Sequence, residues 1–300
     1  MLKGEIEDFL KAGRITAAAK EFALKTIKQG LNIYDYTKSI EEKIYSLKGK
    51  LAFPINISID EFAAHDTPTF KGLEEFKQGQ LVKVDIGAMF NGYLGDTAFS
   101  IEINSDKCSK LINASEEALS NAIKIIKPGT KYCEVGNIIH KTIKSYGFNP
   151  IFNLGGHGLD RFTLHSNVFI PNYDNGNSTK FIVDQMVALE PFATTGAGRV
   201  SDTSVSKIYS LIKKKPVRME SSRKILKYVE ENFNSLPFAD YHLLTQFSIS
   251  QVSIALKELS KAGILHSYPQ LREVSKGLVS QAEHTLLIKE DGAVITTKGE

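Results

Sequence analysis

Apolar residues recur every three to four positions near the start of the chain, the spacing of an amphipathic helix. This pattern predicts a helix over residues 5–29 and a second helix over 34–47. Gly30 is expected to end the first helix, since glycine readily adopts the left-handed conformation that often follows helices. The apolar side chains that set the spacing in the first helix are Ile6, Phe9, Leu10, Ile15, Ala18, Ala19, Phe22 and Ile27.

The same plan of helix, glycine and helix returns over residues 105–147. When the two stretches are aligned without a gap, six pairs of identical residues share the same offset of 99 positions, the difference between 122 and 23. The matches join Ala23, Ile27, Lys28, Gly30, Ile40 and Ile44 to Ala122, Ile126, Lys127, Gly129, Ile139 and Ile143. Two unrelated helix pairs can also look alike, but one register for all six favours an internal duplication. We therefore expect two similar halves that face each other across a shared site.

Two β-hairpins are predicted where apolar runs are interrupted by turn residues. Within residues 81–101, the pair Asn91-Gly92 is a strong signal for a tight turn between two strands. Near the end of the chain, Asp291-Gly292 separates two further apolar runs in the same way. Helix pairs combined with antiparallel hairpins predict an α+β fold.

Residues 207–267 differ from the rest because they are helical in pattern and rich in lysine. The run 248–259 resembles a winged-helix element, a kind of structure that often binds DNA. Its helix carries Lys257 and Lys261 against Glu258, so a packing role is the preferred interpretation. We therefore expect an inserted helical subdomain at 207–267, and a main domain formed by 1–206 and 268–300.

Composition and charge narrow the class of protein. The 300-residue chain is 42% hydrophobic and 24% charged, which is typical of a globular protein. Its net charge of +3 is too small to indicate a specific nucleic-acid partner. Two cysteines, Cys108 and Cys133, cannot build a disulfide framework. The acidic N-terminal segment does not resemble a signal peptide, and no apolar run is long enough to span a membrane. We expect a cytoplasmic protein with no membrane partner.

Acidic residues on apolar strands are the first sign of chemistry. Asp85 and Asp96 stand on the two strands of the first predicted hairpin, roughly opposite one another about its turn. Like charges across a strand pair are destabilising, and buried carboxylates are costly. A cation between them would remove both problems. The alternative, two solvated aspartates, is less consistent with their apolar neighbours.

Glu190 and Glu283 raise the same question, since each adjoins a strongly apolar strand-like run. His157 lies among glycines in Gly155-Gly156-His157-Gly158, where a tight turn could bring the imidazole close to a bound group. Four such carboxylates with one histidine are typical of an oxygen-rich site for two metal ions.

Two further histidines are candidates for substrate contact. His65 and His165 lie close to the repeat distance apart, so the duplication would place them at similar positions facing a shared cleft. The alternative is that both lie on the surface. The remaining histidines outside the predicted strands, His140, His242 and His266, are interpreted as surface positions.

These residues stand in the order and local context of the five metal ligands of the pita-bread (creatinase/aminopeptidase) metallopeptidases. Within that superfamily the chain resembles the type 2 methionine aminopeptidases of the archaeal kind. The resemblance covers essentially the whole chain. The segments that carry it are Ala52-Phe53-Pro54, Ala63-Ala64-His65-Asp66-Thr67-Pro68, Val84-Asp85-Ile86-Gly87, Gly95-Asp96-Thr97-Ala98, Asn153-Leu154-Gly155-Gly156-His157, Leu164-His165, Glu190-Pro191-Phe192 and Glu283-His284-Thr285.

The resemblance implies a role for each matching residue. The metal ligands would be Asp85, Asp96, His157, Glu190 and Glu283, with Asp96 and Glu283 bridging both ions. Glu190 would also carry a proton, and His65 and His165 would contact the substrate. The methionine pocket would be surrounded by Phe53, Phe192, Tyr268 and His284. The sequence departs from the family pattern at Asp66, where a tyrosine is usual, and at Ala282, where a phenylalanine is usual.

The fold implied is a curved antiparallel sheet flanked by helices with a pseudo-two-fold repeat, plus the winged-helix-like insert. The activity implied is removal of the initiator methionine from nascent polypeptide N-termini by two divalent ions, which could be manganese, iron, cobalt or zinc. A monomer that associates transiently with ribosomes is compatible with this role. The alternatives are a proline-specific peptidase of the same superfamily, and a binding protein that keeps the fold without catalysis.

Overall fold

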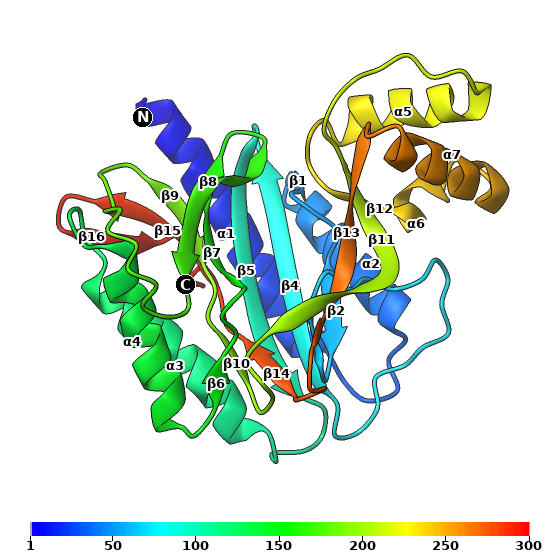
Figure 1. Cartoon of the computed structure of the whole chain (residues 1–300). Helices are drawn as coiled ribbons and strands as arrows, with labels where there is room; N and C mark the ends of the chain where they lie inside the picture. The colour runs from blue at the N-terminus through cyan, green and yellow to red at the C-terminus, as the bar shows by residue number, and fades with distance from the viewer. Residues whose placement is uncertain (1, 300) are drawn as a thin grey trace.

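The computed structural model describes residues 2–299 of the chain and is shown in Figure 1. Helices and strands alternate along it in two similar series, followed by a helical segment and a final hairpin. The helices are α1 (Lys3–Thr26), α2 (Ile33–Ser46), α3 (Ser109–Ile125), α4 (Tyr132–Ser145), α5 (Glu220–Asn232), α6 (Asp240–Leu243) and α7 (Ile249–Lys261). The strands are β1 (Lys50–Leu51), β2 (Asn56–Ile59), β3 (Phe62–Ala64), β4 (Leu81–Phe90), β5 (Tyr93–Glu102), β6 (Asn149–Pro150), β7 (Gly155–Asp160), β8 (Thr163–Pro171), β9 (Met186–Leu189), β10 (Phe192–Thr194), β11 (Val200–Leu211), β12 (Phe238–Ala239), β13 (Leu265–Glu273), β14 (Val279–Gln281), β15 (His284–Lys289) and β16 (Gly292–Ile295).

The strands pair antiparallel throughout the described residues. In the first half, β4 pairs with β1, β2 and β5. In the second half, the order of the strands is β16-β15-β9-β7-β8. Two further sheets, β14-β10-β6 and β12-β11-β13-β3, complete the arrangement. Both hairpins predicted from the sequence are present, and Phe90 pairs with Tyr93 across the expected turn.

Helices cover one face of this curved arrangement. Helix α1 (blue in Figure 1) lies behind β4 and β5, and α3 and α4 (green) pack against the second half. One apolar core fills the space between α1, α2 and β4, and includes Ile40 and Ile44. A separate core lies under α3 and α4 and includes Ile139 and Ile143. The matched isoleucines of the two repeats therefore occupy equivalent core positions.

Hydrogen bonds around the two repeat glycines support the internal duplication. Gly30 and Gly129 have φ angles of 77° and 94°, the left-handed region that glycine tolerates best. The N–H of Gly30 donates to the carbonyl of Phe76 at 2.8 Å, and that of Gly129 donates to the carbonyl of Phe181 at 2.9 Å. The first helix ends at Thr26, slightly before the predicted residue 29, because Ile27 already has an extended backbone.

Helices α5, α6 and α7 form the group at the upper right of Figure 1. They share an apolar core that includes Ile225, Val229 and Leu259. The segment 207–267 begins inside β11 and ends inside β13, so two long strands connect this helical group to the rest. Among the described residues, no helix is both long and apolar enough to cross a membrane.

Candidate metal centre

Asp85 on β4 and Asp96 on β5 are the first pair of the site. Asp85 pairs with Ala98 and Asp96 pairs with Gly87, so the two aspartates are diagonal neighbours on one face of the hairpin. The sequence predicted that the two aspartates lie roughly opposite one another, whereas the residue opposite Asp85 is Ala98, two positions beyond Asp96. Diagonal neighbours on one face of a sheet are still close enough for their side chains to meet.

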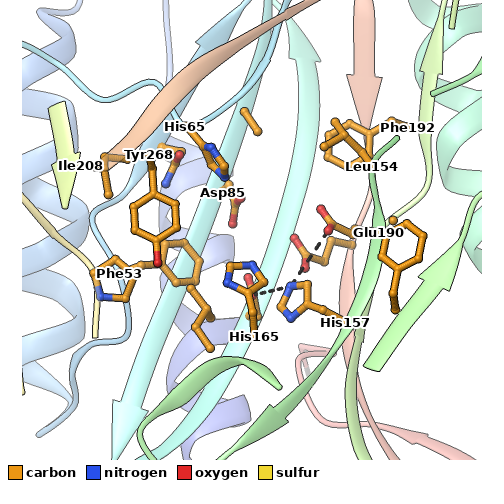
Figure 2. Close-up of a pocket in the computed structure, with 18 of the residues that line it drawn as sticks. Phe53, His65, Asp85, Leu154, His157, His165, Glu190, Phe192, Ile208 and Tyr268 are labelled. Atoms are coloured by element: carbon orange, nitrogen blue, oxygen red, sulfur yellow. Dashed lines mark ion pairs between the residues drawn. The ribbon is translucent and has the colours of Figure 1, made fainter. Parts of the chain in front are cut away.

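Three further side chains converge on this pair from the second half of the molecule. His157 lies on β7, Glu190 directly follows β9, and Glu283 lies between β14 and β15. Potential ligand atoms of Asp96, His157 and Glu283 all lie within 4.8 Å of one another. The Nε2 atom of His157 is 3.6 Å from Asp96 Oδ2 and 4.0 Å from Glu190 Oε1, as the dashed lines in Figure 2 indicate.

The glycines around His157 serve a different purpose from the one predicted. They lie in the extended strand β7 and not in a tight turn. A Cβ atom on Gly158 would lie 2.0 Å from Ser166 Oγ, and one on Gly156 would lie 2.5 Å from the carbonyl oxygen of Ala188. Glycine is therefore needed there because neighbouring strands approach closely on both sides of His157.

Electrostatics show why this cluster suits a cation. Burial raises the pKa of Asp85 to about 7, and burial together with the charges of Asp85 and Glu190 raises the pKa of Asp96. The pKa values of Glu190 and Glu283 are raised as well, first by burial and then by the neighbouring carboxylates. Packing four carboxyl groups together without water is unfavourable in the charged form. A divalent ion would stabilise that form.

Unpaired polar atoms point to the same conclusion. Within residues 2–299, Asp85 Oδ1 and Asp96 Oδ1 are buried and have no hydrogen-bond partner in the protein. Buried polar atoms in proteins are nearly always paired, so such a group needs an explanation. Carboxylate oxygens and an imidazole are the ligands that divalent transition metals take. The donor set thus fits a metal ion.

Gln281 is a part of the site that the sequence reasoning missed. Its Nε2 atom lies 3.3 Å from Glu190 Oε2 and 3.3 Å from Glu283 Oε2, so it donates toward two of the carboxylates. The signal that could have identified it is its position two residues before Glu283. The neighbouring Ala282 faces the other way and packs into the core beneath α3.

A cavity of about 300 Å³ opens over the carboxylates. Figure 2 shows Phe53, His65 and Tyr268 on one side of it and Phe192 on the other. His165 also lines it, with its ring centre 4.3 Å from that of His157. Leu154 and Ile208 add apolar surface.

The histidines of the cavity favour the neutral form. Burial, followed by the influence of His65, lowers the pKa of His165 to about 4. Burial also lowers the pKa of His65, and burial with His165 lowers that of His157 to about 3. Neutral imidazoles can donate a hydrogen bond from one nitrogen and accept one, or bind a metal, at the other.

The structure places His284 apart from the other residues expected at the site. It lies on β15, next to Glu283, and successive side chains of an extended chain point to opposite sides. Its Nδ1 atom is 2.9 Å from Thr297 Oγ1, and the ring lines a separate hollow with Lys20 and Leu24. This explains why His284 does not contact the cavity.

Comparison with known proteins agrees with this geometry. The chain is 43% identical to a methionine aminopeptidase of Thermococcus onnurineus over 98% of its own length and 99% of the relative's. It is 41% identical to a methionine aminopeptidase of Methanocaldococcus jannaschii over 97% and 98% of the two chains.

Solved structures show the same fold. A thermophilic Arx1 superposes with a TM-score of 0.86 at 16% identity, covering 100% of this chain and 92% of that one. The methionine aminopeptidase of Thermotoga maritima superposes with a TM-score of 0.73 at 26% identity, covering 99% and 98%. A prolidase of Pyrococcus furiosus has a TM-score of 0.65 at 20% identity, and this chain covers 65% of it.

The model of metallopeptidase family M24 matches residues 7–230. This match confirms the pita-bread fold expected from the sequence and agrees with the cluster of Asp96, His157 and Glu283. The chain therefore belongs to metallopeptidase family M24.

Proposed function

We propose that this protein is a metal-dependent aminopeptidase that hydrolyses the bond after an N-terminal methionine. The observation that carries the proposal is the convergence of Asp96, His157 and Glu283 under an apolar cavity, in a chain closely similar to methionine aminopeptidases over nearly its whole length. Substrates with a small second residue would be preferred. Within the cell, these substrates would be the N-termini of nascent polypeptides.

We assign the metal ligands to Asp85, Asp96, His157, Glu190 and Glu283. Four carboxylates and one imidazole are enough to hold two divalent ions, and manganese, iron, cobalt and zinc all accept such ligands. Divalent ions in such a site lower the pKa of a water molecule and polarise a peptide carbonyl. The unpaired oxygens of Asp85 and Asp96 support this assignment, because each is buried and free to bind.

Glu190 is the proposed proton carrier. Its carboxylate lies at the edge of the cluster, with Oε1 near His157 and Oε2 near Gln281. A carboxylate in this place can accept a proton from the attacking water and return it to the leaving amine.

His165 and His65 would position the peptide. His165 lies beside His157 and is favoured in its neutral form, so its N–H can donate to the developing negative charge on the carbonyl oxygen. His65 lies across the cavity near Tyr268, with ring centres 5.5 Å apart. His165 and His65 together would hold the backbone of the substrate above the carboxylates.

The side-chain pocket would be formed by Phe53, Phe192 and Tyr268. Phe192 is almost fully buried and Phe53 is 5% exposed, so both present fixed aromatic surface to the cavity. Aromatic rings contact a thioether favourably, and the flexible methionine side chain adapts to such a pocket. Leu154 and Ile208 extend the apolar wall.

The setting we propose is the cytoplasm, with the protein acting as a monomer. A net charge of +3 is compatible with transient association with ribosomes and does not require a nucleic-acid partner. Salt-sensitive co-sedimentation with ribosomes would test this association.

A peptide panel tests the proposed activity. With divalent metal supplied, we expect methionine release from Met-Ala-Ser and Met-Gly-Ser, slower release from Met-Leu-Ser, and no cleavage of Xaa-Pro peptides. Cleavage of Xaa-Pro peptides alone would favour a proline-specific peptidase. The partial overlap with the matched prolidase, of which this chain covers 65%, makes this outcome less expected. Failure to cleave any peptide with any metal would favour a binding protein.

A further inference from the structure

Three polar side chains meet behind the cavity wall that carries His65. Asp66 Oδ1 accepts a hydrogen bond from Gln270 Nε2 at 2.6 Å and another from Lys207 Nζ at 3.2 Å. Lys207 Nζ also donates to the carbonyl oxygen of Thr67 at 2.7 Å. The Asp66 and Lys207 side chains are each 20% exposed, so this ion pair is partly shielded from water. We call Asp66, Lys207 and Gln270 the rear cluster.

The rear cluster joins segments that are far apart in the sequence. Asp66 follows β3, Lys207 lies on β11 and Gln270 lies on β13. The pairing of β11 with β13 shifts register between Ser206 and Ile208, which places Lys207 at an irregularity of the strand. Such bulges are frequent beside functional sites, where they redirect a side chain.

Each member of the ion pair is next to a residue of the cavity. Asp66 follows His65, and Lys207 precedes Ile208. Asp66 and Lys207 line a different hollow from the one that His65 and Ile208 line. The rear cluster therefore lies behind His65 and Ile208, on the side of these residues that faces away from the proposed substrate.

His65 needs such support because its backbone is unfavourable. Its φ angle is 61°, in the left-handed region that residues with a side chain rarely adopt. Its Nδ1 atom lies 3.3 Å from the carbonyl oxygen of Pro269, the residue before Gln270. Bonds to Asp66 and Thr67, directly after His65, hold this conformation from one side. A conformation of this kind persists when its surroundings fix it.

We propose that Asp66, Lys207 and Gln270 are positioning residues that fix His65 against strands β11 and β13. By doing so they set the position of His65 relative to Ile208 in this wall of the cavity, and with it the fit of the substrate. This inference rests on the proposed function, because it assigns the rear cluster to the binding of the same peptide. It assigns no role in metal binding to the cluster.

The test compares Asp66→Ala, Lys207→Met, their double variant and the conservative Asp66→Asn. Lys289→Met is a matched control, since Lys289 pairs with Asp184 at 2.7 Å and the two are 32% and 28% exposed. For each protein we would measure kcat and KM for Met-Ala-Ser, metal content, and the imidazole NMR signal of His65. The NMR signal reports the surroundings of His65 whether or not the protein is active.

We expect Asp66→Ala and Lys207→Met each to lower kcat/KM about tenfold at unchanged metal content. The double variant should lose less than the product of the two single losses, because both single variants remove the bond between Asp66 and Lys207 while each removes one further bond of its own. Asp66→Asn keeps an oxygen acceptor and should stay within about threefold of the wild type. The His65 signal should shift in the alanine and methionine variants and not in the Lys289→Met control.

The inference is overturned if the single variants leave kcat/KM and the His65 signal unchanged, or if their losses multiply in the double variant. An equal loss in Lys289→Met would also overturn it, since the effect would then be general destabilisation. If the wild type releases no methionine, the proposed function fails. The His65 signal would still decide whether the rear cluster positions that residue.

Discussion

At the scale of single residues, four carboxyl groups buried in one cluster are the main electrostatic feature of this protein. Asp96 and Glu283 are 3% and 1% exposed, and burial together with neighbouring carboxylates raises the pKa of both. Without a cation, folding the chain with these groups charged is unfavourable. The protein without metal is thus expected to be less stable than its apolar cores would allow.

This leads to a prediction for Asp96→Asn. The substitution keeps the shape of the side chain and removes a buried charge, so the free energy of unfolding of the metal-free protein should rise by about 1–3 kcal/mol. Metal binding, followed by calorimetry, should weaken strongly, and peptide hydrolysis should fall with it. Tight metal binding by a destabilised Asp96→Asn protein would contradict the assignment of Asp96 as a ligand.

His165 provides a prediction of a different kind. Because we assign it to the substrate and not to the metal, His165→Ala should lower kcat about 100-fold while metal content stays the same. His140→Ala is the control, since His140 lies on α4 and its ring contacts Phe152. A large loss of metal from His165→Ala, measured by elemental analysis, would show that the assignment is wrong.

The sequence was sufficient to identify site residues that are charged but stand among apolar neighbours. Asp85, Asp96 and Glu190 are acidic residues in apolar runs, and the structure brings them together with His157. Gln281 was missed because a glutamine beside a strand carries no such conflict. His242, interpreted as a surface residue, is 8% exposed and bonded to Glu41, a contact between positions about 200 residues apart that no local pattern reveals.

At the scale of elements, the packing of α1 depends on a glycine. A Cβ atom on Gly13 would lie 2.5 Å from the carbonyl oxygen of Thr296 and 2.7 Å from its Cβ. These distances are too short, so the helix and the segment after β16 would have to separate. Gly13 thus permits the close contact between α1 and the end of the chain.

Gly13→Ala is expected to destabilise the protein by about 1–3 kcal/mol, although alanine favours helices over glycine. Gly4→Ala in the same helix is the matched control, because a Cβ atom there would meet nothing within 4 Å. That control should leave stability unchanged or raise it by up to about 1 kcal/mol. Urea unfolding of both variants decides the matter, and equal effects at the two positions would contradict the account.

In the first hairpin the turn was predicted correctly, but the relative position of Asp85 and Asp96 was predicted only approximately. The two-residue turn at Asn91-Gly92 was predicted, and it fixes the register in which Phe90 faces Tyr93. That register places Asp96 opposite Gly87, two positions from Asp85, because strand pairing is counted outward from the turn. Applying the turn geometry to the sequence would have given the diagonal arrangement.

At the scale of the whole molecule, α2 is linked to the helical segment by a buried carboxylate. Glu41 is fully buried and accepts hydrogen bonds from the hydroxyl of Tyr241 at 2.6 Å and from Nε2 of His242 at 2.9 Å. Lys38 also donates to it. Burial alone would raise the pKa of Glu41, but His242 and Lys38 bring it below its ordinary value of 4.5.

A carboxyl group with a lowered pKa contributes stability above its unfolded-state pKa and loses it as the pH falls through the folded one. We therefore expect the wild type to lose stability relative to Glu41→Gln as the pH drops below about 4.5. At neutral pH, Glu41→Gln should be less stable by about 1–3 kcal/mol. Thermal unfolding across this range measures both effects, and parallel curves for the two proteins would contradict the role of the charge.

The sequence predicted the duplicated halves and the helical character of residues 207–267. It could not show how the segment is attached, because β11 and β13 each continue through the predicted boundaries. The pairing of these long strands depends on contacts distant in sequence, which periodicity does not report. The division into 1–206 with 268–300 and 207–267 stays a prediction, which limited proteolysis would test.

Methionine release by this protein should depend on divalent metal ions held by the buried carboxylates and His157. The most direct measurement is methionine release from Met-Ala-Ser by metal-stripped protein as manganese or cobalt is added back. We predict no release without metal, and release that rises with added metal and levels off near two ions per chain. Full release by the stripped protein, or none at any metal concentration, would contradict the account.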